Sequence, residues 1–137
     1  MSRPPMRIAG PVLNTNDPVR LGEFYERLLG WTIVEREGPR LGYPPQDAWV
    51  KLRSPDDDWK IEIQWEEHYE PPTWPSRQGE QQMMMHLDIA VEDLEAGVAW
   101  AIECGATVAA HQPQEEVRVM LDPSGHPFCL FPSPIDW

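Results

Sequence analysis

The chain contains two segments that resemble each other, one in each half. Residues 16–31 and 92–106 each start near an acidic residue, continue as an amphipathic helical pattern and end just after a glycine. A strand-like alternation precedes each segment, and further strand-like stretches follow it. Such a repeat predicts two copies of one folding unit. Because units of about sixty residues are barely stable alone, we expect them to share a core and to place functional groups where they meet.

Length and charge limit the classes of protein that the chain can belong to. At 137 residues we expect a single domain over 1–137. A net charge of −12 argues against nucleic acid or an anionic membrane as a partner, and it agrees either with simple solubility or with attraction of a cationic ligand. No apolar run approaches the roughly 20 residues of a membrane span. A polar start and two cysteines suggest a cytoplasmic protein with reduced thiols.

The hydrophobic pattern predicts the order strand, helix and three strands, a linker, and then the same order again. We expect half-units at about 6–67 and 83–132, joined by a proline-rich linker at 68–82. The expected strands are 7–15, 31–37, 48–53, 59–66, 83–91, 106–110, 116–121 and 127–131. This order indicates an α+β fold with helices on one face of each sheet. The uncovered faces are then free to enclose a cavity.

Strand alternation assigns side chains to faces of the predicted sheets. Glu62 and Gln64 share one face of their strand. His86 and Asp88 share a face that is opposite to Leu87 and its aliphatic neighbours. We therefore expect polar groups to line the cavity, while aliphatic groups pack under the helices.

Three motifs occur in a fixed order along the chain: Asn16-Asp17-Pro18 with Gly30-Trp31, then His86-Leu87-Asp88, then Asp122-Pro123-Ser124-Gly125-His126. Together they resemble the glyoxalase, bleomycin-resistance and extradiol-dioxygenase group, which is the vicinal oxygen chelate superfamily, and its short glyoxalase-like branch above all. The resemblance implies tandem βαβββ modules that form a cup-shaped eight-stranded mixed sheet with helices outside. It also implies a small-molecule ligand and, as in many members, a homodimer.

Metal-dependent members of that superfamily carry one ligand on each of four strands. The matching positions here are Gly10, Glu62, His86 and Cys129. Gly10 offers no side chain, and Cys129 stands where the family has a glutamate. The resemblance therefore implies Glu62, His86 and Cys129 as candidate ligands of a divalent metal such as zinc, nickel, manganese or iron, with nitrogen, oxygen and sulfur all acceptable to zinc.

Each candidate also has a purely structural interpretation. His86 would be satisfied by a hydrogen bond to Gln64 or Asp88, and Cys129 is equally suited to be a small buried apolar residue. Trp74 in the linker is expected either to close over the cup as a lid or to lie at an interface.

Other groups are predicted to lie outside the site. His68, His111 and His126 are expected at the surface, since they fall in linker or turn contexts. The methionine run 83–85 is expected to pack as an ordinary strand.

Two main classes of function follow. The first is a metal-assisted lyase, isomerase or dioxygenase, in which Glu62, His86 and Asp88 are catalytic and Glu62 or Asp88 moves a proton. The second is a non-catalytic, bleomycin-resistance-like protein that sequesters a drug or metabolite. In either case Gln64, His86, Asp88, Trp74 and Cys129 are the expected ligand-binding residues. A regulatory or structural dimer is a third, weaker interpretation.

Overall fold

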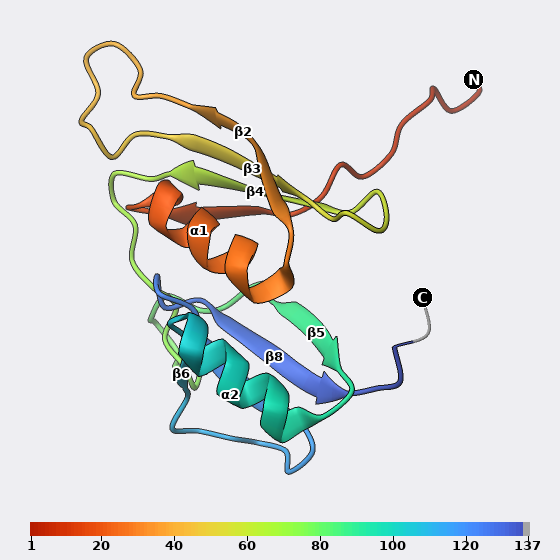
Figure 1. Ribbon diagram of the computed structural model, residues 1–137. Coiled ribbons are helices and arrows are strands. Elements are labelled where there is room, and N and C mark those ends of the chain that lie inside the picture. The colour runs from red at the N-terminus through yellow and green to blue at the C-terminus, as the bar shows by residue number, and fades with distance from the viewer. Residues whose placement is uncertain (136–137) are drawn as a thin grey trace.

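The computed structural model describes residues 1–135, and within them it contains two helices and eight strands (Figure 1). The first half comprises β1 (Val12–Thr15), α1 (Pro18–Leu29), β2 (Thr32–Glu37), β3 (Trp49–Arg53) and β4 (Lys60–Trp65). The second half comprises β5 (Leu87–Val91), α2 (Leu94–Cys104), β6 (Thr107–Val108), β7 (Arg118–Leu121) and β8 (Pro127–Pro132). The predicted order of elements is confirmed. None of the described helices has the length and apolar character needed to cross a membrane.

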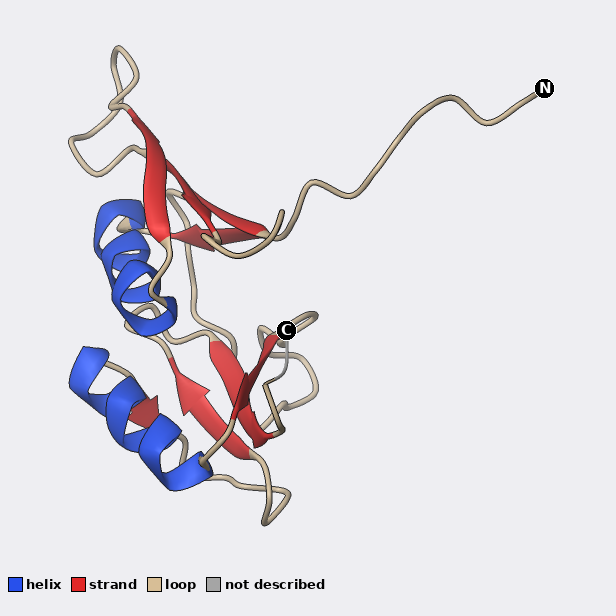
Figure 2. Ribbon diagram, turned by 45° about the vertical axis from the view of Figure 1, so that its right-hand side comes forward, coloured by secondary structure: helices blue, strands red, loops and turns tan. Residues whose placement is uncertain are grey.

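The strands form two four-stranded mixed sheets of the same topology, β1-β4-β3-β2 and β5-β8-β7-β6. In each sheet the first strand of the half pairs parallel with the last, and the remaining pairs are antiparallel. The helices lie side by side on one side of the molecule and the sheets lie on the other (Figure 2). The predicted α+β class with paired βαβββ modules is confirmed, and the eight strands are divided between two sheets.

Both helices begin and end where the sequence predicts. The Asp17 carboxylate accepts a hydrogen bond from the Arg20 amide at 3.3 Å, and the Asp93 carboxylate accepts one from Ala96 at 3.0 Å. These contacts satisfy amide groups that have no partner within the helix. At the other ends, Gly30 and Gly105 adopt the left-handed conformation that favours glycine.

The core lies between α1 and the first sheet and continues into the second half. Leu21, Phe24 and Tyr25 of α1 are buried together with alternate residues of β3 and β4, namely Val50, Leu52, Ile61 and Ile63. The residues between these point to the opposite face. In α2, Ala101 is buried and Cys104 packs against the core, whereas Ile102 is 50% exposed.

Two strands, β1 and β5, start at least four residues later than predicted. The ladder of β1 begins at Val12 because Pro11 has no amide hydrogen to donate. The ladder of β5 begins at Leu87, and Met84 and Met85 before it are 86% and 85% exposed. The expectation that the methionine run packs as a strand is therefore wrong for these two side chains. The methionine run has the sequence pattern of a strand, but among the described residues it pairs with no neighbouring strand.

Candidate functional site

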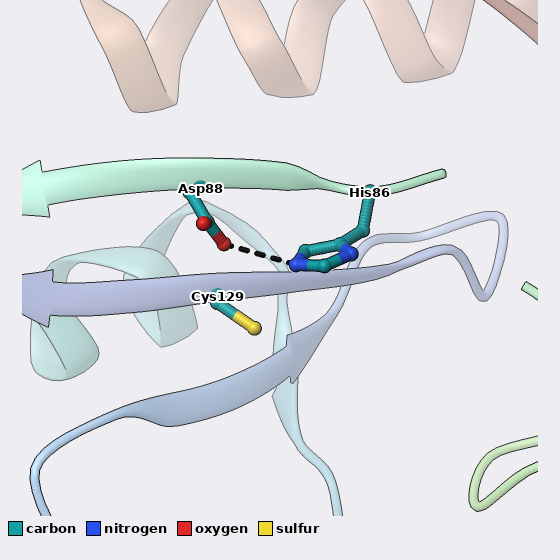
Figure 3. Close-up of side chains that lie close together, drawn as sticks. All are labelled: His86, Asp88 and Cys129. Carbon is teal, nitrogen blue, oxygen red and sulfur yellow. Dashed lines mark ion pairs between the residues drawn. The ribbon is translucent and has the colours of Figure 1, made fainter. Parts of the chain in front are cut away.

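Three side chains of the second sheet converge on the face away from α2 (Figure 3). His86 immediately precedes β5, Asp88 lies within it, and Cys129 comes from β8, where it is in register with Asp88. The Nε2 atom of His86 lies 3.0 Å from Oδ1 of Asp88. One potential ligand atom from each residue lies within 4.8 Å of those of the other two. The predicted shared face of His86 and Asp88 is confirmed.

The donor set of this group fits a zinc-type metal. Ligand atoms about 2.0–2.3 Å from a tetrahedral zinc lie roughly 3.3–3.8 Å from one another. Donors already within 4.8 Å of each other would reach those separations with small side-chain rotations. A nitrogen, an oxygen and a sulfur ligand leave a fourth position free for water or substrate, as in catalytic zinc sites. Metal binding would replace the contact between His86 and Asp88.

Cys129 is a thiol in these surroundings. Burial raises the pKa of the Cys129 thiol above its ordinary value, and the neighbouring carboxylate of Asp88 raises the pKa further through its charge and a hydrogen bond. A thiol with a raised pKa is a poor nucleophile at neutral pH. Covalent chemistry at Cys129 alone is therefore disfavoured, whereas a bound cation would favour the thiolate.

A cavity of about 180 Å³ borders two of these donors and is lined by His86, Cys129 and Trp74 together with Gln114 and with methionine, valine and proline side chains. Trp74 belongs to the linker. Its indole Nε1 donates a hydrogen bond to the carbonyl oxygen of His111 at 3.0 Å, and the Trp74 and His111 rings lie 5.8 Å apart. The linker therefore supplies one wall of the cavity through Trp74. Its predicted role, as a lid or at an interface, stays a prediction.

Glu62 and Gln64 lie on the first sheet, apart from this group. The Glu62 carboxylate lies 3.9 Å from the amines of both Lys51 and Lys60. Gln64 donates a hydrogen bond from Nε2 to Oδ1 of Asn14 at 2.8 Å. The resemblance implied Glu62 as the third candidate ligand, but in the described residues Asp88 takes that place beside His86 and Cys129.

The fourth family position is closed by the backbone. Gly10 has a φ of +144°, and a Cβ atom there would lie 2.5 Å from the carbonyl oxygen of Lys60. A side chain at this position would require the chain to shift. The first strand therefore has no room for a metal ligand at its family position.

His126 is the main residue that the sequence interpretation misplaced. It was expected at the surface, but its side chain is only 16% exposed. Its Nδ1 atom lies 2.8 Å from the Asp122 carboxylate, and its Nε2 atom lies 2.9 Å from the carbonyl oxygen of Asn14. The Tyr25 hydroxyl donates to the same carboxylate at 2.7 Å. The motif Asp122-x-x-x-His126 contains the signal, but its partners are distant in sequence.

This cluster joins the two halves of the molecule. The Tyr69 hydroxyl donates to the carbonyl oxygen of Ser124 at 2.7 Å, and the Ser124 and Thr15 hydroxyls are also 2.7 Å apart. Burial raises the pKa of Tyr25 and of Tyr69 above the ordinary tyrosine value, and the negative charge of Asp122 raises both further. Both phenols therefore remain hydrogen-bond donors. The cluster holds the modules together and does not line the cavity at His86.

Comparison with known proteins places this geometry in context. A family model described as a glyoxalase-like domain matches residues 11–131. A comparison with curated proteins finds no match. Among solved structures, a glyoxalase family protein from Enterococcus faecalis has 20% identity and a TM-score of 0.64, with 91% of this chain and 96% of that chain covered.

Two further solved structures show the same fold. A glyoxalase/bleomycin resistance protein/dioxygenase family enzyme from Burkholderia phytofirmans has 17% identity and a TM-score of 0.60, covering 89% of this chain and 94% of that one. A genomically encoded fosfomycin resistance protein from Listeria monocytogenes has 11% identity and a TM-score of 0.67, with 94% of both chains covered. With its paired modules and a family match over most of its length, the chain belongs to the glyoxalase-like domain family and has the vicinal oxygen chelate fold.

Proposed function

We propose that the protein binds a divalent metal, zinc in the first place, on His86, Asp88 and Cys129, and acts on a small organic molecule in the adjacent cavity. The observation that carries the proposal is the convergence of three donor types within 4.8 Å. His86 and Cys129 also line the cavity, so a molecule inside it would lie next to the donors.

A metal in this position would act as a Lewis acid and polarise an oxygen atom of the substrate, which suits a lyase, an isomerase or a dioxygenase. The chain itself contributes the surroundings. Trp74 and the valine and proline side chains of the wall would shield part of a bound molecule from water, which would strengthen electrostatic interactions there. Within the chain, Nε2 of His86 and Oδ1 of Asp88 lie 3.0 Å apart, so the two polar groups are already oriented toward each other.

The size of the cavity supports a small substrate. Its volume of about 180 Å³ is below the roughly 300–1,000 Å³ of sites for drug-sized ligands. Most of its lining is apolar, and His86, Gln114 and Cys129 supply its polar groups besides the Trp74 indole. This arrangement suits a compact molecule with one oxygen-bearing end, and it supports a large sequestered drug less well.

The proposal is tested by titration of zinc against a chromophoric chelator, and of cobalt(II), whose thiolate complexes absorb in the near ultraviolet. We expect one metal per chain and a thiolate-to-cobalt band that is absent from Cys129→Ser. His86→Ala should weaken zinc binding beyond the about 10–100-fold that an outer-shell change costs. Glu62→Gln is the matched control and should bind as the unchanged chain does.

Two results would contradict the proposal. If the unchanged chain takes up no metal, the metal-assisted activity fails, and a non-catalytic binding protein becomes the better description. If Glu62→Gln loses metal as strongly as Asp88→Asn, the ligand set implied by the family resemblance replaces the one proposed here. The homodimer and the cytoplasmic location remain predictions.

A further inference from the structure

A second cavity, of about 270 Å³, lies on the first sheet and shares no lining residue with the cavity at His86. It is bordered by the segment between β2 and β3 and by the ends of β3 and β4. The lining residues that bear on its chemistry are Glu37, Arg40, Asp47, Trp49, Gln64 and Trp65. The metal site described above uses none of them.

Strand register builds the floor of this cavity. Trp49 of β3 pairs with Glu37 of β2 on one side and with Gln64 of β4 on the other. The three side chains therefore form one row across the sheet, on the face opposite the buried Val50 and Ile63. Since Gln64 uses its amide nitrogen to donate to Asn14, its Oε1 atom remains as an acceptor.

The segment between β2 and β3 forms a braced wall. Arg40 donates from Nε and Nη2 to the Asp47 carboxylate at 3.0 and 2.9 Å, and Asp47 is only 4% exposed. The Arg40 guanidinium also lies 3.9 Å from the centre of the Tyr43 ring. The Tyr43 ring in turn meets Trp65 edge-on at 5.9 Å. The cavity is thus held open by contacts within the chain.

The charges of the lining favour a cation. The Asp47 carboxylate offsets the charge of Arg40 through the paired hydrogen bonds, which weakens the attraction of the guanidinium for an anion. The carboxylate of Glu37 is the second acid of the lining, which leaves one more carboxylate than guanidinium. Indole rings attract cations, and they also pack against hydrocarbon.

We propose that this cavity binds a small organic ammonium ion. Its ammonium group would donate to Glu37 and to Oε1 of Gln64, while its hydrocarbon part would pack against Trp49 and Trp65. The net charge of −12 assists the approach of such a ligand from solution. The site is independent of the metal centre, because the two lie on different sheets and share no residue.

The test uses 2-phenylethylammonium and its uncharged isostere 2-phenylethanol in isothermal titration calorimetry. We expect the cation to bind with a dissociation constant of about 1 mM or below, and at least about tenfold more tightly than the alcohol. Glu37→Gln should remove most of the preference for the cation, whereas Trp49→Leu should weaken the binding of both compounds. Glu23→Gln, which removes an exposed carboxylate from α1, is the matched control and should change nothing.

Circular dichroism and the melting temperature of Trp49→Leu establish that a loss of binding does not reflect unfolding. Glu37 is exposed, so its substitution tests the site without that concern. Cys129→Ser should bind the cation unchanged, which separates this site from the metal centre. Equal affinity for the cation and the alcohol, no binding of either, or an unaffected Glu37→Gln variant would each overturn the proposal.

Discussion

The two sheets place different chemistry at equivalent positions of the same framework. In the first sheet, Glu62 of β4 is in register with Val12 of β1 and with Lys51 of β3. In the second, Cys129 of β8 is in register with Asp88 of β5 and with Val119 of β7. The family positions two residues before Val12 and Asp88 are Gly10 and His86 respectively.

The difference shows how a duplicated unit can keep its architecture while one copy loses its donors. Glu62 is held between two lysines, so its charge is compensated within the first sheet. In residues 1–135, the ion-pair partner of Asp88 is His86, and no lysine or arginine pairs with it. A cation is therefore expected to compete poorly at Glu62 and well at Asp88.

The largest expected effect concerns the turn between the last two strands of each half, β3 and β4 in the first and β7 and β8 in the second. Asp122 accepts hydrogen bonds from Tyr25, Ser124 and His126, and its side chain is fully buried. We expect Asp122→Ala to lower the free energy of unfolding by about 3 kcal/mol or more, because the buried Tyr25 hydroxyl loses a charged acceptor. Urea denaturation measures the change.

The corresponding turn of the first half supplies the control. Asp57 accepts one hydrogen bond from the Trp59 amide at an exposed position. Asp57→Ala should cost at most about 1 kcal/mol, within the range of a single exposed hydrogen bond. Equal costs at Asp57 and Asp122 would show that the contacts between the halves add nothing to stability.

Gly10 provides the second prediction. A Cβ atom at this position meets the Lys60 carbonyl oxygen at 2.5 Å, and φ is +144°. Gly10→Ala should lower the free energy of unfolding by about 1–3 kcal/mol, as expected for a strained backbone position. Gly30→Ala is the comparison, since Gly30 also has a positive φ of +67° but nothing within 4 Å of a new Cβ. If Gly10→Ala lowered the free energy of unfolding less than Gly30→Ala, the conclusion that the backbone leaves no room for a side chain at position 10 would be wrong.

The third prediction concerns the reactivity of the two cysteines. Asp88 helps to keep the Cys129 pKa high, so Asp88→Asn should speed iodoacetamide alkylation of Cys129 near pH 8 by about a few fold. Burial also raises the pKa of Cys104, but Asp88 takes no part there. Peptide mass spectrometry should find an unchanged rate at Cys104. An unchanged rate at both cysteines would place Asp88 outside contact with Cys129.

The same raised pKa has a consequence for stability with a defined sign. A group whose pKa is higher in the folded state stabilises the fold below its ordinary pKa, and this contribution is lost as pH rises through the folded value. The unfolding free energy of the unchanged chain should therefore decline above the ordinary thiol range. Cys129→Ser should reduce that decline, as urea denaturation across alkaline pH would show.

Local pattern was sufficient to predict much of this molecule. Capping by Asp17 and Asp93 and the glycine stops are encoded within a few residues, and alternation alone placed His86 and Asp88 on one face. Which side chain joins His86 and Cys129 as the third donor could not be predicted from local pattern. Alternation assigns Glu62 and Asp88 to faces but does not specify that β5 of the same half, and not β4 of the first half, lies beside Cys129. Likewise His126 depends on Asn14 and Asp122 on Tyr25, pairs that are 112 and 97 residues apart.

The smallest expected effect tests whether the positive charges of the lysines beside Glu62 are the only reason to expect no metal on the first sheet. Lys51→Met removes one of the two amines beside Glu62. The Lys51 amine also lies 2.8 Å from the Glu35 carboxylate. Because both ion pairs of Lys51 are partly exposed, the free energy of unfolding should fall by no more than about 1 kcal/mol. Zinc titration should find no second metal, since Gly10 and Val12 still offer no donors where the second sheet has His86 and Asp88. A second zinc in Lys51→Met would mean that charge compensation, and not the missing donors, separates the two sheets.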